Sequence, residues 1–228
     1  AQAACDDVDA VSIVTRLFDE PRLGAAHARP CERLSGKLSI DRVATASRRY
    51  LEKEALAQEL PAFTAAFLDH VAALPRQPDV IHAHFSDAAA VALAARERFG
   101  IPFVYTPHAL GIDKLRQHCG GAELQARIAA ERAAIGQADA LVVSTRDEAE
   151  RQVRAYGVGT AGRIHCLPPG VPQQPAADLR HGLAAKLGDW LEAPDKPILL
   201  AIARPVRKKN LLALARAFAA TPPLMARA

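Results

Sequence analysis

The sequence predicts an α/β fold in which a Rossmann-like parallel sheet carries helices on both faces. Short apolar runs of strand length alternate with Ala-rich segments whose apolar residues recur at helical spacing. The connections between these segments are short, and repeated βα units with short connections require a parallel sheet covered by helices. With 228 residues, the chain has material for one large domain or two smaller ones.

The first part of the chain is expected to form two strands and one long helix. The apolar stretch 8–18 contains the first strand, at 13–15, and a weaker strand runs from 37 through 43. A helix is expected over 53–73, because its Leu, Phe and Val residues recur every three or four positions.

The middle of the chain has the most regular alternation. The expected strands lie at 79–85, 103–106, 140–144 and 163–167. The expected helices lie at 88–99, 122–137 and 145–156. This βαβα order is the basis for the predicted parallel sheet.

Polar residues and a glycine mark the ends of these helices. Ser86 or Asp87 is predicted to cap the helix that follows it, and Gly100 is predicted to end that helix. Ser144 and Thr145, at a later strand end, are expected to cap the next helix rather than to contact a substrate.

A Pro-Pro-Gly-Val-Pro run at 168–172 is the best candidate for a domain boundary. We therefore expect a first domain over 1–172 and a linker over 173–195, with a short helix around 183–191. The first βα unit of a second Rossmann-like domain is expected over 196–228.

A cluster of four cations follows the last expected strand, the apolar run 197–203. Arg204 stands at the strand's carboxyl end, and Arg207, Lys208 and Lys209 come just before an Ala- and Leu-rich helical pattern. Ligands of open α/β sheets bind beyond the carboxyl ends of strands, and a helix N-terminus favours a phosphate group. The pattern is typical of an anion site. The alternative interpretation is a basic turn that faces solvent.

Three histidines lie at or near the ends of expected strands. His108 follows the strand 103–106 and is expected at its carboxyl end, whereas His82 and His84 are two apart on one strand and so share a face. Zinc would need a third or fourth protein ligand, and Asp87 is the nearby candidate. We therefore predict no metal site.

The composition argues against several functional classes. The net charge of +4 is modest and aromatic residues make up 5%, so nucleic-acid binding is not indicated. No apolar run approaches the roughly 20 residues of a membrane span. The four cysteines have neither zinc nor redox-motif spacing, which favours reduced thiols: Cys5, Cys31, Cys119 and Cys166. We expect a soluble, cytoplasmic protein.

Seven short segments, in one order along the chain, resemble sucrose-phosphate synthases and related retaining glycosyltransferases. They are 50–54 (YLEKE), 80–88 (VIHAHFSDA), 106–115 (TPHALGIDKL), 127–132 (RIAAER), 144–148 (STRDE), 168–171 (PPGV) and 203–210 (ARPVRKKN). The resemblance covers roughly positions 8 to 220. It implies two Rossmann-like domains that face each other across a cleft, the arrangement called GT-B, with the acceptor on the first and the nucleotide sugar on the second.

The resemblance implies transfer of a hexose from a nucleotide sugar, UDP-glucose, with retention and without a metal or other cofactor. Arg204 and Lys209 match the family's basic pair on the donor diphosphate, where they would stabilise the leaving group. His108 resembles the histidine that hydrogen-bonds the donor hexose. These three residues are the expected catalytic set.

The resemblance also implies an acceptor, fructose 6-phosphate. Lys114, Arg127 and Arg132 resemble the basic set that binds its phosphate, and His84 lies at a strand end that lines the acceptor pocket. The alternative for the two arginines is an ordinary exposed position on an amphipathic helix, with Glu131 as a local partner.

Compared with the family, the chain keeps most of the acceptor domain and the opening βα unit of the donor domain, without the first strand and Gly-rich loop. We expect it to be inactive by itself, and an exposed domain face would favour self-association. One alternative function is the same class with free fructose or another acceptor, as in a sucrose synthase or a mannosyltransferase. The other is a non-catalytic module that binds a sugar phosphate or a partner chain.

Overall fold

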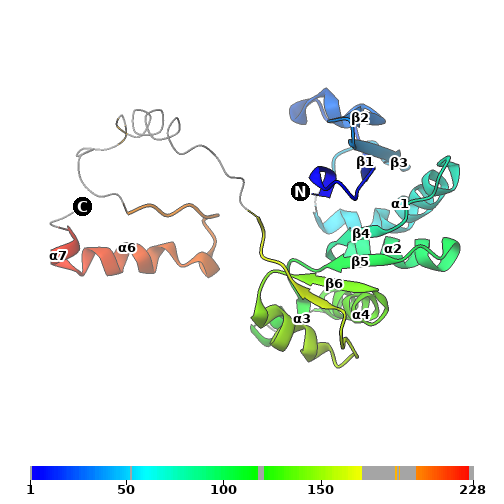
Figure 1. The fold of residues 1–228 in the computed structure, drawn as a ribbon. Coiled ribbons are helices and arrows are strands. Elements are labelled where there is room, and N and C mark those ends of the chain that lie inside the picture. The colour runs from blue at the N-terminus through cyan, green and yellow to red at the C-terminus, as the bar shows by residue number, and fades with distance from the viewer. Residues whose placement is uncertain are drawn as a thin grey trace. The chain divides into compact units, whose positions relative to one another are not determined.

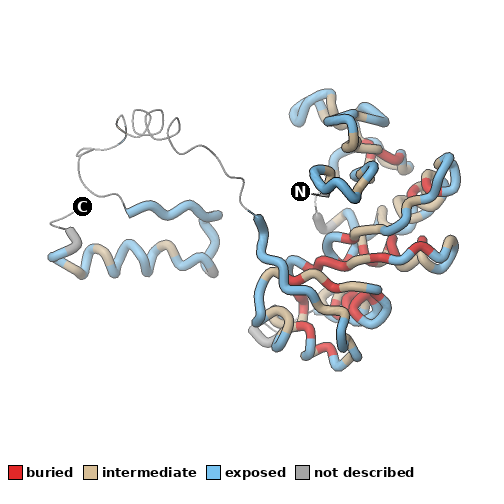
Figure 2. The backbone as a smooth tube through the Cα atoms, in the orientation of Figure 1, coloured by how far each residue is buried: buried red, intermediate tan, exposed pale blue. Residues whose placement is uncertain are grey.

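The computed structural model describes residues 2–51, 53–117, 121–170, 188, 190 and 199–225. The chain forms two compact units, Ala1–Pro169 and Gly170–Ala228. Buried residues are concentrated in the first unit, whereas the described residues of the second are mostly exposed (Figure 2).

The first unit contains the predicted parallel sheet (Figure 1). Its strand order is β4-β5-β6-β7 and every pair is parallel. The strands are β4 (Ile81–His84), β5 (Phe103–Thr106), β6 (Ala140–Val143) and β7 (Ile164–Cys166). In the register, Ile81 pairs with Phe103 and His84 with Thr106, so β4 and β5 end at the same edge.

Helices flank this sheet, which confirms the predicted α/β class. α2 packs against β4 and β5, α4 packs against α2, α3 packs against α4, and α1 packs against α2. Their bounds are α1 (Lys53–Ala73), α2 (Phe85–Phe99), α3 (Gly111–Gln117) and α4 (Ala122–Gln137). The helical spacing predicted α1 and α4 with these bounds, whereas α3 was not predicted.

Apolar side chains from the strands and helices form the core of the first unit. Its largest fully buried apolar or aromatic members are Tyr105, Tyr156, Phe103, Ile135 and Leu141. Burying one such side chain stabilises the fold by roughly 1.5–3 kcal/mol, so this core fixes the sheet and hence its edges. A second cluster joins α1 to α2.

A smaller, mixed sheet precedes the parallel one. β1 (Val11–Leu17) is parallel to β3 (Leu38–Ala44), as expected, but β2 (Cys31–Arg33) is antiparallel to β3. β2 was not predicted because its Cys-Glu-Arg sequence has no apolar run. Backbone pairing and the contact of Glu32 with Arg42, 2.7 Å long, hold it in place. Short 3-10 segments also occur here: η1 (Gln2–Ala4), η2 (Pro21–Leu23) and η3 (Ala25–Ala28).

The predicted cap of α2 was wrong. The helix begins at Phe85 with His84 at its N-cap and no side-chain hydrogen bond there, so Ser86 and Asp87 lie inside the first turn. A carboxylate in the first turn still favours the helix through its dipole. Gly100 ends the helix in the left-handed conformation, as expected.

The predicted helix at 145–156 is a π-helix followed by a 3-10 turn, η4 (Glu148–Val153) and η5 (Arg154–Tyr156). Its expected cap is present. Thr145 Oγ1 accepts a hydrogen bond from the Glu148 backbone N–H at 3.1 Å, and a Glu148 carboxylate oxygen accepts one from the Ser144 N–H at 2.7 Å.

The second unit contains η6 (Arg207–Lys209), α6 (Leu211–Ala219) and α7 (Pro222–Met225). The predicted strand at 197–203 does not form in its described part, 199–203, which is exposed and without regular structure. The described residues of this unit contain no strand to pair with it, and an unpaired strand leaves its backbone groups unbonded. The short helix expected around 183–191 lies outside the described residues.

Within the described residues, no helix is both long enough and apolar enough to cross a membrane.

Candidate active site

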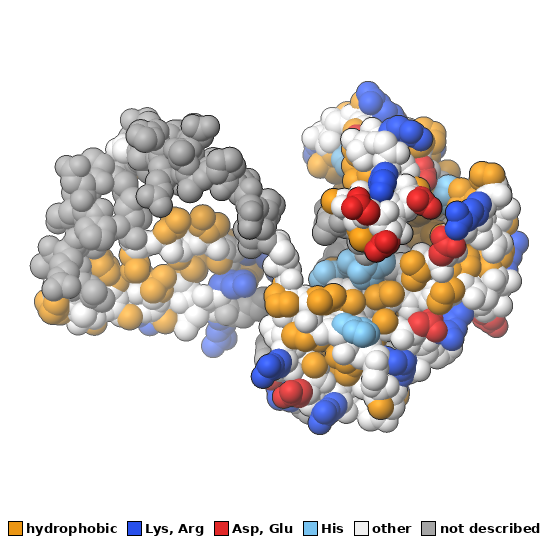
Figure 3. Space-filling model, viewed as in Figure 1, with side chains coloured by type: hydrophobic (Ala, Val, Ile, Leu, Met, Phe, Trp, Pro, Cys, Tyr) orange, Lys and Arg blue, Asp and Glu red, His pale blue; other side chains and the backbone are white. Residues whose placement is uncertain are grey.

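Histidines gather at the carboxyl edge of the parallel sheet. His84 ends β4, and His108 lies two residues after β5. Because the two strands end level with each other, both imidazoles lie at one edge, where open α/β sheets bind ligands. Figure 3 shows histidine side chains gathered on an exposed face of the first unit, next to hydrophobic side chains.

The backbone at this edge is strained. Phe85 has φ 70° and His108 has φ 55°, and among the described residues Asn210 is the one other non-glycine residue with positive φ. The Ala109 N–H donates to the Pro107 carbonyl at 2.6 Å, so His108 is the centre of a γ-turn. Such conformations cost about 1–3 kcal/mol each and cluster at functional sites, which marks this edge as a candidate.

The histidine side chains contact one another. His84 Nδ1 lies 2.7 Å from His108 Nε2, so one ring nitrogen donates and the other accepts. His82 stacks on His84 with 4.2 Å between ring centroids, and its Nε2 lies 2.7 Å from Thr106 Oγ1. The Phe85 ring lies 4.9 Å from that of His108.

Partial burial favours the neutral forms of His82 and His84. It lowers the pKa of His82 from 6.5 to about 4, with smaller effects from His84 and His108. Burial, followed by the neighbouring His108, also lowers the pKa of His84. Near pH 7 these two imidazoles therefore act as hydrogen-bond donors and acceptors without adding charge.

A buried carboxylate lies beneath the His108 turn. Glu131 of α4 is fully buried and accepts hydrogen bonds from the Gly111 N–H at 2.8 Å, from Arg127 Nε at 2.7 Å and from the Tyr156 hydroxyl. Arg127 Nη2 also donates to the Ala109 carbonyl at 2.5 Å. Glu131 is thus the local partner of Arg127 that the alternative interpretation expected, but it is buried rather than on the surface.

Tyr156 links this carboxylate to the second residue of α3. Its hydroxyl oxygen accepts a hydrogen bond from the Ile112 N–H at 3.2 Å, and its carbonyl accepts one from Arg132. Burial, and then the bond to Glu131, raises the pKa of the Tyr156 hydroxyl, so the hydroxyl stays protonated. The sequence analysis did not identify Tyr156, because nothing in the residues around it indicates a hydrogen bond to Glu131 on α4.

The three cations predicted to bind the acceptor phosphate lie on neighbouring helices but differ in their surroundings. Lys114 is exposed on α3, directly after the His108 turn. Arg127, on α4, donates to Glu131 and to the Ala109 carbonyl, and Arg132, on the same helix, donates to the Tyr156 carbonyl. Both arginines therefore help to hold the backbone near the His108 turn and after the π-helix.

An exposed ion-pair network joins α3 to the π-helix. Arg151 lies 2.6 Å from a carboxylate oxygen of Asp113 and 2.6 Å from one of Asp147. The Arg151 hydrogen bond holds the pKa of Asp147 down at about 2. Exposed pairs stabilise little, so this network adds to the placement of α3 rather than determining it.

The predicted donor-phosphate residues lie in the second unit. Arg204 is exposed, and Lys209 is exposed directly before Asn210, the N-cap of α6. Asn210 has φ 51°, so the chain turns sharply between η6 and the helix. Within this unit, Lys209 therefore lies at a helix N-terminus of the kind that favours anions.

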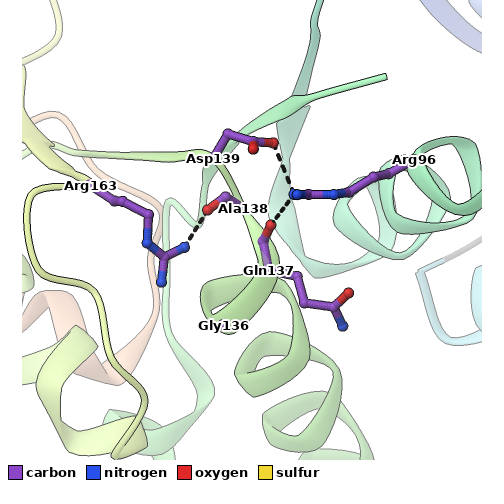
Figure 4. A pocket seen from close by; sticks show the side chains of 6 residues that line it. All are labelled: Arg96, Gly136, Gln137, Ala138, Asp139 and Arg163. Carbon is purple, nitrogen blue, oxygen red and sulfur yellow. Dashed lines mark hydrogen bonds and ion pairs between the residues drawn. The ribbon is translucent and has the colours of Figure 1, made fainter. Parts of the chain in front are cut away.

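A cavity lies at the opposite edge of the sheet. It has a volume of about 410 Å³ and is lined by Arg96, Gly136, Gln137, Ala138, Asp139 and Arg163. Figure 4 shows both guanidinium groups turned toward backbone carbonyls at the end of α4. Arg96 donates to the Gln137 carbonyl and Arg163 to the Ala138 carbonyl, so both arginines cap this helix.

Among the described residues, no group of three or more His, Cys, Asp or Glu side chains is arranged to hold a metal ion.

Comparison with known proteins adds an independent observation. The profile of the family described as "Glycosyl transferase 4-like domain" matches residues 1–170. Sucrose-phosphate synthase 4 of Arabidopsis thaliana is 28% identical over 98% of this chain and 29% of its own length. A D-inositol 3-phosphate glycosyltransferase of Geodermatophilus obscurus is 32% identical over 86% of this chain and 44% of its own length.

A solved structure agrees with these relatives. The sucrose-phosphate synthase of Thermosynechococcus elongatus superposes with a TM-score of 0.71 at 25% identity, covering 92% of this chain and 50% of that chain. The chain spans less than half the length of the two curated relatives.

Proposed function

Since the chain belongs to the glycosyl transferase 4-like family, we propose that it is part of a retaining, metal-independent hexosyltransferase of GT-B architecture. In this proposal the first unit binds a phosphorylated acceptor and the second unit begins the nucleotide-sugar site. The proposed donor is UDP-glucose, and the proposed acceptor is fructose 6-phosphate. The observation that carries the proposal is the strained, histidine-bearing edge of the parallel sheet, next to Lys114.

Each proposed ligand contact follows from the chemistry of the side chain. Transfer with retention produces an oxocarbenium-like sugar and a departing diphosphate, so the leaving group needs positive charge. Arg204 and Lys209 would supply that charge, because a planar guanidinium and a compact ammonium both bind phosphate oxygens well. His108 would hydrogen-bond a hydroxyl of the hexose.

The acceptor contacts are proposed for Lys114 and His84. Lys114 is exposed on α3, the helix that follows the His108 turn, and so lies near the histidine-bearing edge of the sheet. We therefore propose that Lys114 is the main side chain that binds the phosphate group of the acceptor. His84 is exposed at the end of β4 and would line the pocket beside it.

A second acceptor is supported by the relative named for D-inositol 3-phosphate, which has the higher of the two identities. Both candidate acceptors are phosphate esters of a small polyol. Lys114 would therefore bind the phosphate of either acceptor, and contacts with the acceptor's hydroxyl groups would distinguish the two.

Calorimetric titration of the chain with fructose 6-phosphate, D-inositol 3-phosphate and free fructose tests the proposal. We expect saturable binding of one phosphate ester and none of fructose, with Lys114→Ala weakening the binding about tenfold, which is the loss of one charge-assisted contact. Arg76→Ala is the control, because it removes an exposed cation at the amino end of β4.

Two outcomes of the titration would contradict the proposal. Absence of binding for all three ligands would contradict the acceptor assignment, and equal weakening by Lys114→Ala and Arg76→Ala would contradict the role of Lys114. Preferential binding of one ester would identify the acceptor.

A further inference from the structure

We propose that Glu131 is a positioning residue that, with Arg127 and Tyr156, clamps the turn bearing His108. The proposal rests on the proposed function only in treating His108 and Lys114 as ligand-binding side chains. Neither Glu131 nor Tyr156 is assigned a contact with a ligand.

The clamp contacts the chain at three closely spaced points, one in the His108 turn and two at the start of α3. Arg127 donates to the Ala109 carbonyl, Glu131 accepts from the Gly111 N–H, and the Tyr156 hydroxyl accepts from the Ile112 N–H. The three side chains also bond one another through the Glu131 carboxylate. A single connected network therefore satisfies the backbone groups that follow His108.

The strain at His108 explains why a clamp is needed. A γ-turn with positive φ at a histidine persists only when the surrounding structure holds it. Within the turn, the Ala109 N–H donates to the Pro107 carbonyl. The clamp bonds the other backbone group of the same residue, because Arg127 donates to the Ala109 carbonyl. Without the clamp, the backbone is expected to relax and the His108 ring to move away from His84.

Close packing under the turn supports the same conclusion. A Cβ atom added at Gly111 would lie 3.0 Å from a carboxylate oxygen of Glu131 and 3.0 Å from a side-chain carbon of Ile128. The backbone at the start of α3 thus approaches the buried carboxylate as closely as a glycine allows.

The buried charge is balanced by the clamp. The Glu131 carboxylate is fully buried, and Arg127 supplies the opposite charge while two neutral donors fill further acceptor positions. A buried carboxylate that is paired in this way is costly to disturb, so the network has one preferred geometry. That geometry sets where α3 begins and therefore where Lys114 lies on it.

Two variants and one matched control test the proposal. Glu131→Gln removes the charge and replaces one acceptor oxygen, and Tyr156→Phe removes only the hydroxyl. Asp139→Asn is the control, because Asp139 bonds both a backbone N–H of β5 and Arg96, but at the opposite edge of the sheet. The readouts are thermal melting, nitrogen-15 NMR of the histidine rings, and affinity for fructose 6-phosphate.

We expect Glu131→Gln and Tyr156→Phe to shift the ring-nitrogen signals of His84 and His108, and to weaken ligand binding at least tenfold and about threefold, respectively. Asp139→Asn should lower the melting temperature while leaving these signals and the affinity unchanged. The proposal is overturned if both clamp variants lower the melting temperature but leave the His84 and His108 signals unchanged.

If Glu131→Gln does not fold, Tyr156→Phe decides by the same criterion. If the wild-type chain does not bind the ligand, the ring-nitrogen signals still test the clamp, so its failure can be told apart from failure of the proposed acceptor.

Discussion

The two edges of the parallel sheet use polar groups in opposite ways. At the amino edge, Arg96 and Arg163 lie beside a cavity but donate to backbone carbonyls that end α4. At the carboxyl edge, the turn after β5 and the start of α2 hold positive φ angles, and exposed imidazoles face solvent.

This difference shows why the cavity is not the candidate site. The arginines that cap α4 donate N–H groups to the carbonyls that the helix end leaves without an intrahelical partner. Strained backbone, in contrast, lowers stability and is retained where it serves another purpose. The carboxyl edge therefore combines conformational cost with exposed imidazoles, whereas the contacts of the amino edge are explained by stability alone.

The largest expected effect comes from adding a methyl group at each edge. Gly111→Ala places a Cβ 3.0 Å from Glu131 and Ile128, whereas a Cβ at Gly136 would meet its nearest neighbour, Val158, at 4.0 Å. We expect Gly111→Ala to lower the free energy of unfolding by about 1–3 kcal/mol. Gly136→Ala, inside α4, should raise it by up to about 1 kcal/mol. Urea unfolding measures both, and similar changes for the two variants would show that the edges are packed alike.

A smaller effect is expected from relieving the strain at His108. Both His108→Ala and His108→Gly remove the ring, but glycine tolerates φ 55°. We expect the glycine variant to be more stable than the alanine variant by about 1 kcal/mol. Ala109→Gly is the matched control, since its φ is not positive, and it should lose about 0.5–1 kcal/mol. Equal stability of the two His108 variants in urea unfolding would argue against strain at this turn.

An effect no larger than that at His108 is expected in the pH dependence of the histidine cluster. The pKa of His82 is lowered from 6.5 to about 4, so the folded state favours the neutral ring. Its contribution to stability is complete above the unfolded pKa and is lost as pH falls from about 6.5 toward 4. Between pH 7 and pH 5 the loss should be on the order of 1 kcal/mol, after discounting for its partial exposure.

Replacing His82 checks this dependence. His82→Asn should flatten the fall in unfolding free energy between pH 7 and pH 5, and His165→Asn, an exposed histidine on β7, should not. An unchanged fall in His82→Asn would place the responsible group elsewhere.

Local sequence patterns predicted most elements of the first unit. The bounds of α1, α4 and β5 match the predicted ranges, because apolar spacing reports which face of an element is buried. The missed elements have weak local signals. β2 is held by its pairing with β3, and α3 follows the clamped turn.

The predicted strand at 197–203 shows the limit of the same reasoning. Its apolar run has the composition of a buried strand, yet its described part is exposed. Apolar composition indicates that a segment can be buried, but a strand also needs a neighbour to pair with. The second unit offers no such neighbour among its described residues.

The sequence by itself determined the α/β class and placed His84 and His108 at strand ends, because both depend on periodicity and on where apolar runs stop. Only the tertiary structure showed that Glu131 is buried beneath the His108 turn, that Tyr156 bonds it from 25 positions away, and that His108 has positive φ. Those features depend on contacts between residues distant along the chain. Packing decides such contacts, and spacing along one element does not reveal them.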